Sequence, residues 1–232
     1  EDEAEVYMVN LGDGSGREES APDIAPPVAG LPAGTEAGSC LHHILEKIDF
    51  CDVQSAKSTA MIERALTLWG VQPDDQTAAV AAYREAVLRT MSTPLDVGSG
   101  VFRLSEIAPE DRLAEVAFCF SIGNLNPARL ANILRECGSA RAAAISARVS
   151  RLKFSEVYGF LDGFIDLVFR KDRKYHIVDW KSNYLGEHAL DYAPERLAWA
   201  MDDSLYTLQY LLYAVSLHRY LRLRLKEYEP SL

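Results

Sequence analysis

Two aspartates interrupt apolar segments in the second half of the sequence. Asp166 lies within the apolar run 160–169, and Asp179 lies within the apolar run 175–180. Aspartate is depleted in strands and is rarely buried without a partner. The two runs flank the polar tetrad 171–174, which is the pattern of a β-hairpin. Carboxylates within apolar strands therefore indicate a candidate functional site.

The geometry of the turn decides whether these two aspartates meet. If the turn is symmetric about Asp172 and Arg173, Asp166 lies directly opposite Asp179. Directly paired side chains have Cβ atoms ~4.5–5.5 Å apart, and like charges there are destabilising. A divalent cation between the carboxylates would relieve that repulsion, and hard oxygen ligands favour Mg²⁺. A loop with one residue more or fewer would spoil this register.

Lys181 adds a positive charge to the same place. It follows Asp179 by two residues, so strand alternation projects both side chains from one face. Its ammonium could orient an attacking water and stabilise the negative charge of a phosphorane-like transition state. The alternative is a structural Asp–Lys ion pair, which leaves Asp166 unexplained.

Around these residues the sequence resembles a known family. Residues 163–166 (GFID) and 179–183 (DWKSN) resemble the paired motifs of RecB-family nucleases, within the superfamily that has an Asp…(Asp/Glu)-x-Lys active site. Residues 161–186 look like the beta subunit of bacterial exodeoxyribonuclease V nearly throughout. Two weaker matches are the first-helix motif at 38–46 and a Gln-x-x-x-Tyr helix motif at 209–213. The resemblance extends over roughly residues 35 to 228.

The resemblance implies a role for each matching residue. Asp166 and Asp179 would bind the metal, His42 would complete its shell, and Trp180 would offer its backbone carbonyl. Lys181 would be the catalytic lysine. The expected cofactor is Mg²⁺, and Mn²⁺ or Ca²⁺ could occupy the same site.

Other residues have competing interpretations. Gln209 and Tyr213 would contact the active site or the DNA strand, although a tyrosine there is also typical of a core. Glu115 is a candidate accessory carboxylate or a solvent-facing strand residue. A lone helix histidine such as His42 is often a surface residue, and His43 is its competitor as a ligand.

Periodic patterns predict the elements around the hairpin. Helices are expected at 56–69 and 75–91, and another is expected to begin at the Asn126 cap. The expected inward-facing sets follow: Leu41, Ile44, Leu45 and Ile48 in a first helix; Leu130, Ile133, Leu134 and Cys137 after Asn126; Leu205, Leu208, Leu212 and Val215 in a long helix over 204–226. Residues 113–120 alternate as a strand, with Ala114, Val116, Phe118 and Phe120 on one face. The resemblance implies an α/β, restriction-endonuclease-like core, with a mixed central sheet flanked by helices and with inserted helices near 55–95.

The two ends differ from the middle in composition. Residues 1–37 lack a helical or strand period and hold nine acidic residues against Arg17, so we expect a flexible acidic linker. The nuclease domain is expected over 38–232. The family ends with a further strand after its long helix, and none is expected here, so the sequence is interpreted as the C-terminal part of a larger subunit cut before that strand.

Charge, cysteines and hydropathy limit the remaining possibilities. The net charge is −10, but outside the first 37 residues it is only about −2, and 141–181 carries nine basic against five acidic residues. Such a local basic face can hold a phosphate backbone. The four scattered cysteines are expected to be free thiols of a cytoplasmic protein. No apolar run approaches the ~18 residues that span a membrane.

Together these patterns predict a Mg²⁺-dependent exo/endonuclease domain that hydrolyses DNA phosphodiesters. The resemblance implies single-stranded DNA as substrate and a helicase–nuclease complex that acts in double-strand-break repair and recombination. The implied partners are the gamma and alpha subunits of exodeoxyribonuclease V and a helicase region that precedes residue 1. Two alternatives stay open: a catalytically inactive module that binds DNA or a subunit, and a stand-alone phage- or restriction-type nuclease.

Overall fold

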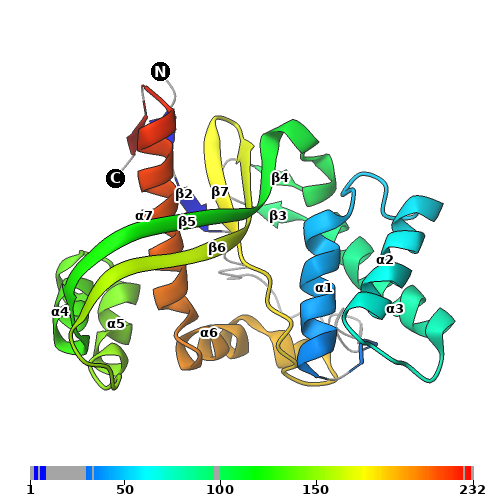
Figure 1. The fold of residues 1–232 in the computed structure, drawn as a ribbon, viewed down its shortest axis with the longest axis horizontal. Coiled ribbons are helices and arrows are strands. Elements are labelled where there is room, and N and C mark those ends of the chain that lie inside the picture. The colour runs from blue at the N-terminus through cyan, green and yellow to red at the C-terminus, as the bar shows by residue number, and fades with distance from the viewer. Residues whose placement is uncertain are drawn as a thin grey trace. The chain divides into compact units, whose positions relative to one another are not determined.

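The computed structural model of the protein describes residues 3–4, 6–8, 30–32, 34–96, 100–226 and 228–230. The chain forms two compact units. Unit 1 holds Glu1–Val6, Val116–Ile165 and Glu195–Leu232, and unit 2 holds Tyr7–Glu115 and Asp166–Pro194. Both contain helices and strands, which confirms the predicted α/β class (Figure 1).

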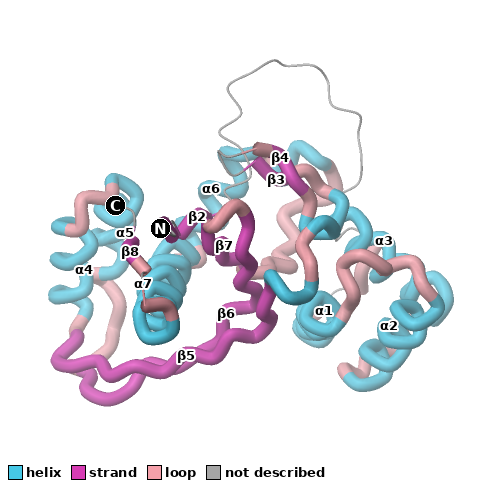
Figure 2. The backbone as a smooth tube through the Cα atoms, turned by 90° about the horizontal axis from the view of Figure 1, so that it is seen from above, coloured by secondary structure: helices cyan, strands magenta, loops and turns pink. Residues whose placement is uncertain are grey.

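Unit 2 contains three α-helices over Thr35–Ser92. They are α1 (Thr35–Lys47), α2 (Ala56–Leu68) and α3 (Gln76–Ser92), and α2 lies beside both of the others (Figures 1 and 2). Ser55 and Asp75 cap α2 and α3, because each side chain accepts a hydrogen bond from a backbone N–H of the first turn. The helices predicted at 56–69 and 75–91 are therefore confirmed.

The core of unit 2 lies between α1 and the hairpin strands. All four residues of the predicted α1 stripe are buried, and they share a cluster with Leu167, Phe169 and the half-buried Trp180. Tyr83 of α3 is fully buried and donates a 3.0 Å hydrogen bond to the Ala37 carbonyl of α1. Burial of this apolar stripe fixes α1 against the strands that carry the two aspartates.

The principal sheet has four strands in the order β2-β7-β6-β5. Their bounds are β2 Val6–Met8, β5 Arg112–Leu125, β6 Val157–Lys171 and β7 Lys174–Val178. Shorter elements are β1 (Glu3–Ala4) parallel to β8 (Glu229–Pro230), β3 (Leu95–Asp96) antiparallel to β4 (Val101–Phe102), and the 3₁₀ turns η1 (Leu104–Glu106), η2 (Pro109–Asp111) and η3 (Ala189–Tyr192).

Strand β5 departs from the predicted alternation at Glu115. That residue has a φ of 51°, which is outside the extended region and breaks the period of two. Val116, Phe118 and Phe120 are half-buried as a set, whereas Ala114 is exposed. The prediction that Ala114 shares their face is wrong for this reason.

Unit 1 contains α4 (Pro127–Glu136), α5 (Ala140–Val149), α6 (Pro194–Asp203) and α7 (Tyr206–Arg224). Asn126 accepts a hydrogen bond from the Arg129 N–H, which confirms the predicted cap. The core of this unit joins Leu134, Ile145 and Val149 to residues of α7.

The inward faces of these helices differ from prediction at several positions. Ile133 and Cys137 are exposed, because α4 packs on α5 through Ala131 and Leu134. Val215 is exposed as well, and the buried residues of α7 are Thr207, Ser216, Leu217 and Leu221. Leu205 precedes α7 in the left-handed conformation, so the helix begins at Tyr206 and not at Ser204.

The termini also differ from the predicted pattern. β1, β2 and the first residues of α1 lie within 1–37, the segment expected to be a flexible linker, and the short strand β8 follows α7, where no strand was expected. The rest of the expected linker lies almost entirely outside the described residues. Among the helices that the structure describes, none is long and apolar enough to cross a membrane.

Candidate active site

The β6–β7 hairpin has the register that the sequence predicts. The paired residues run from Lys171 opposite Lys174 to Leu167 opposite Val178. Asp172 and Arg173 form a two-residue turn with φ values of 50° and 65°, as in a type I′ turn that matches strand twist. Asp166 and Asp179 directly adjoin the last of these pairs, one on each side of the hairpin.

Asp166 is the more enclosed of the two carboxylates. Its side chain is 13% exposed, and its Oδ2 accepts a 2.7 Å hydrogen bond from the backbone N–H of Trp180. Burial raises the pKa of Asp166, and the negative charge of Asp179 raises it further. The Trp180 N–H opposes both effects because it stabilises the ionised form. This backbone donor has no side-chain signature and could not be read from the sequence.

Lys181 contacts Asp179 directly. Its Nζ and the Asp179 Oδ2 form an ion pair, and both side chains are partly exposed, at 26% and 21%. Strand β7 ends at Val178, so this contact is made just beyond the regular pairing. The structure thus brings the candidate lysine and both candidate aspartates to one end of the hairpin.

Helix α1 brings a histidine to the same carboxylate. His42 Nδ1 lies 3.7 Å from Asp166 Oδ2. The competing His43 turns to other partners: its Nδ1 lies 3.7 Å from Glu46 Oε2, and its ring meets Trp69 edge-on. This geometry favours His42 over His43 as a candidate ligand.

Glu115 lies within electrostatic range of the cluster. Partial desolvation raises the pKa of the Glu115 carboxyl although the residue is largely exposed, and the negative charges of Asp166 and Glu46 raise it further. Its left-handed backbone conformation is uncommon for a residue other than glycine, and such strain often accompanies functional sites. These features support Glu115 as an accessory candidate.

Gln209 and Tyr213 belong to unit 1. They lie one turn apart on α7, and Gln209 Nε2 donates a 2.8 Å hydrogen bond to Tyr213 Oη. The Tyr213 ring packs edge-on against Phe118 of β5. The structure therefore joins this predicted pair to each other and to β5.

The two carboxylates of the candidate site fit a hard divalent cation in type, because Asp166 and Asp179 supply oxygen ligands. His42 could add an imidazole nitrogen to the same shell. A cation there would also offset the repulsion that raises the pKa of Asp166. Among the described residues, no three such side chains already converge as a metal cluster. In the present arrangement the Asp179 carboxylate is engaged by Lys181.

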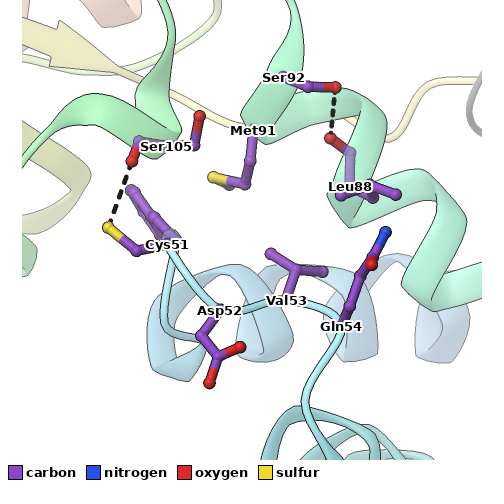
Figure 3. Close-up of a pocket in the computed structure, with 9 residues that line it drawn as sticks. Cys51, Asp52, Val53, Gln54, Leu88, Met91, Ser92 and Ser105 are labelled. Atoms are coloured by element: carbon purple, nitrogen blue, oxygen red, sulfur yellow. Dashed lines mark hydrogen bonds between the residues drawn. The ribbon is translucent and has the colours of Figure 1, made fainter.

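A separate cavity of about 260 Å³ lies elsewhere in unit 2 (Figure 3). Apolar side chains that include Leu88 and Met91 share its walls with polar ones such as Gln54. Cys51 lies on its edge and its Sγ is hydrogen-bonded to the Ser105 carbonyl at 3.2 Å. None of the candidate site residues lines this cavity, so catalysis is not expected there.

All four cysteines are free thiols, as predicted.

Comparison with known proteins finds a matching family model and several relatives. The family model described as "PD-(D/E)XK nuclease superfamily" matches residues 17–227. The chain is 35% identical over 245 residues to the RecBCD enzyme subunit RecB of Mycobacterium tuberculosis, covering 99% of this chain and 22% of that protein. It is 33% identical over 200 residues to RecBCD enzyme subunit RecB of Escherichia coli, covering 86% of this chain and 16% of that one.

The matches cover very different shares of this chain and of its relatives. The chain spans only about a fifth of the length of these relatives. The family model, by contrast, covers most of the chain and includes the hairpin and α1. The chain therefore belongs to the PD-(D/E)XK nuclease superfamily.

Proposed function

We propose that this chain is a Mg²⁺-dependent nuclease domain that hydrolyses DNA phosphodiesters. The observation that carries the proposal is the grouping of Asp166, Asp179 and Lys181 at one end of the hairpin, with His42 facing Asp166. A solely structural ion pair needs only Asp179 and Lys181. It gives no reason for a second, largely buried carboxylate whose pKa is raised.

Each residue has a definite task in this proposal. Asp166, Asp179 and His42 would hold Mg²⁺, with the Trp180 backbone carbonyl as a further ligand, while the Trp180 N–H orients Asp166. When bound, Mg²⁺ would activate water and polarise the phosphoryl oxygens. Lys181 would orient the attacking water and stabilise the charge that develops on the phosphate.

Three further residues would support the reaction. Glu115 would act as the accessory carboxylate, because its carboxyl group is close enough to feel the charges of Asp166 and Glu46. Gln209 and Tyr213 would contact the DNA strand or the active site, and their hydrogen bond would hold both side chains in one orientation.

The preference for single-stranded DNA is supported by the β6 segment in unit 1. By strand alternation Tyr158, Phe160 and Phe164 fall on one side of β6, and they are 65%, 73% and 55% exposed. The other side is covered at Gly163, where an added Cβ would lie 2.7 Å from the Phe118 ring. Exposed aromatic rings offer stacking surfaces for unpaired bases, which a duplex does not present.

The biological setting is proposed from the relatives. Their name, RecBCD enzyme subunit RecB, supports a place in a helicase–nuclease complex that acts in double-strand-break repair and recombination. The partners would be the gamma and alpha subunits of exodeoxyribonuclease V and a helicase region of the same subunit, in the cytoplasm. The acidic segment over the first 37 residues would connect the nuclease domain to that helicase region.

The direct test is digestion of end-labelled single-stranded DNA. The protein is expected to cleave it with Mg²⁺, and chelator should abolish cleavage. Asp166→Asn, which removes the buried charge and retains the side-chain size, should be inactive under the same conditions. Cleavage that persists in chelator, or in Asp166→Asn, would contradict the proposal. Binding of DNA without cleavage under all metal conditions would instead support an inactive binding module.

A further inference from the structure

Gly38 occupies an unusually close contact in the second turn of α1. A Cβ placed at this glycine would lie 2.7 Å from Ser182 Oγ and 3.7 Å from Ser182 Cβ. Glycine inside a helix is destabilising by about 1 kcal/mol relative to alanine. A glycine at this point leaves room for the Ser182 hydroxyl, which a side chain at residue 38 would have to displace.

The contact lies beside both candidate ligands and the candidate lysine. Ser182 directly follows Lys181 in the chain. His42 follows Gly38 by four residues, so both lie on one face of α1, one turn apart. This face of α1 contacts Ser182, after β7, at Gly38. One turn further along, His42 Nδ1 lies 3.7 Å from Asp166 Oδ2 of β6.

We propose that Gly38 is a positioning residue for the metal site, and this inference rests on the proposed function. By permitting α1 to approach Ser182, the missing side chain sets the distance between His42 on the helix and the carboxylates on the hairpin. Gly38 itself touches neither metal nor substrate. Its effect on metal binding passes through His42.

The size of the expected displacement supports this role. Ordinary contacts of a Cβ begin at 3.4 Å, so a methyl group at residue 38 requires about 0.7 Å more room. Metal–ligand distances are held to about ±0.2 Å. Unless the Ser182 hydroxyl turns away, a shift of α1 by even part of that amount takes His42 out of range of a cation held by the aspartates.

A pair of matched variants separates this effect from helix propensity. Gly38→Ala adds the methyl group, and Ser182→Ala removes the hydroxyl that it would meet. With the hydroxyl absent, the remaining 3.7 Å distance between the two Cβ positions is an ordinary contact. The double variant should therefore regain the parental arrangement.

The measurement is Mn²⁺ affinity by calorimetry, with chemical denaturation of each variant as the test of folding. Gly38→Ala should bind Mn²⁺ at least about tenfold more weakly, the scale on which supporting residues affect metal sites. Its unfolding midpoint should stay close to that of the parent, because the gain in helix propensity offsets the cost of the new contact. Ser182→Ala and the double variant should bind within about threefold of the parent.

Two results would overturn the positioning role. One is parental Mn²⁺ affinity in Gly38→Ala; the other is a double variant that folds but binds as weakly as Gly38→Ala. Should Gly38→Ala fail to fold, Ser182→Thr tests the same contact from the other side and should also weaken binding. A parent protein that binds no Mn²⁺ would instead overturn the metal site, and the inference with it.

Discussion

At the residue scale, the site depends on a pair of like charges, Asp166 and Asp179, that lie close together at one end of the hairpin. The desolvated Asp166 carboxyl has a raised pKa partly because Asp179 is close. Two like charges so close together destabilise the fold by themselves. A cation bound between them would relieve the repulsion, so the same pair of carboxylates would then favour metal binding. The metal affinity of these two residues is therefore the property to measure.

Asp179→Asn is expected to weaken Mg²⁺ or Mn²⁺ binding by at least about tenfold, because a charged ligand contributes no less than a supporting residue does. Asp172→Asn is the matched control: it removes an equal charge from the turn of the same hairpin, and asparagine tolerates the φ of 50° found there. Calorimetry on both variants decides the question. Equal affinities in Asp179→Asn and the parent would remove Asp179 from the site.

His176 gives a separate, acid-dependent prediction. It is fully buried and stacked on Phe169, and its pKa is lowered from 6.5 to about 4, mainly by burial and in smaller part by the charges of Lys174 and Lys171. Asp172 and the Lys171 backbone oppose this shift. Between those pH values the unfolded chain binds more protons than the folded one, so the free energy of unfolding falls as the pH is lowered.

The loss should reach roughly 3 kcal/mol across this window, at about 1.4 kcal/mol per pKa unit. His176→Phe should flatten the dependence, because it retains the stack and removes the titrating group. Urea unfolding of both proteins from pH 7 to pH 4 measures this. Parallel slopes for the parent and His176→Phe would rule out His176 as the cause.

Much of the candidate site could be predicted from local rules. Strand alternation and a two-residue turn were sufficient to predict the hairpin register up to Leu167 opposite Val178, since both follow from backbone geometry. The Trp180 N–H and the Gly38–Ser182 contact were not predictable. A backbone donor has no residue type, and the approach of a helix to a loop depends on the packed core.

At the element scale, the expected preference for single-stranded DNA depends on the exposed aromatic rings of β6. Replacing Phe160 and Phe164 by alanine should weaken binding of a single-stranded oligonucleotide, measured in Ca²⁺ to prevent cleavage. Stacking contributes about 1–3 kcal/mol per base, so the loss should be roughly tenfold or more. The corresponding tryptophan variants should bind as the parent does.

Leucine variants provide the control for simple hydrophobic contact at these positions. They retain apolar surface but cannot stack, so they should bind as weakly as the alanine variants. Leucine variants with parental affinity would show that the rings serve another purpose. An equal loss of duplex binding in the alanine variants would count against single-strand recognition.

The elements themselves were predictable where their periodicity was strong. α2, α3 and the start of α4 were expected from apolar spacing and capping residues, and they occur as expected. α5 and α6 were not expected. Alanine supplies most of the apolar positions of α5, and α6 has no buried residue, so neither gives a clear contrast between faces.

At the scale of the whole molecule, the N-terminal segment is expected to be dispensable for folding. Leu31 is the first residue whose side chain the structure describes, and it packs against the core that α1, α2 and α3 form. Removal of residues 1–29 deletes β1 and β2 and leaves this core complete. The shortened chain should unfold cooperatively in denaturant, and loss of that cooperativity would assign the segment a structural role.

The central claim is catalysis, and Lys181 tests it most directly. Lys181→Ala should lower single-turnover cleavage of single-stranded DNA by roughly 10²-fold or more, the effect of losing one preorganised charge-stabilising group. DNA affinity in Ca²⁺ should change little, since one phosphate contact among several is lost. Lys174→Ala, which removes a cation near the turn of the same hairpin, should cleave as the parent does. Near-parental cleavage by Lys181→Ala would contradict the assignment of Lys181 as the catalytic lysine.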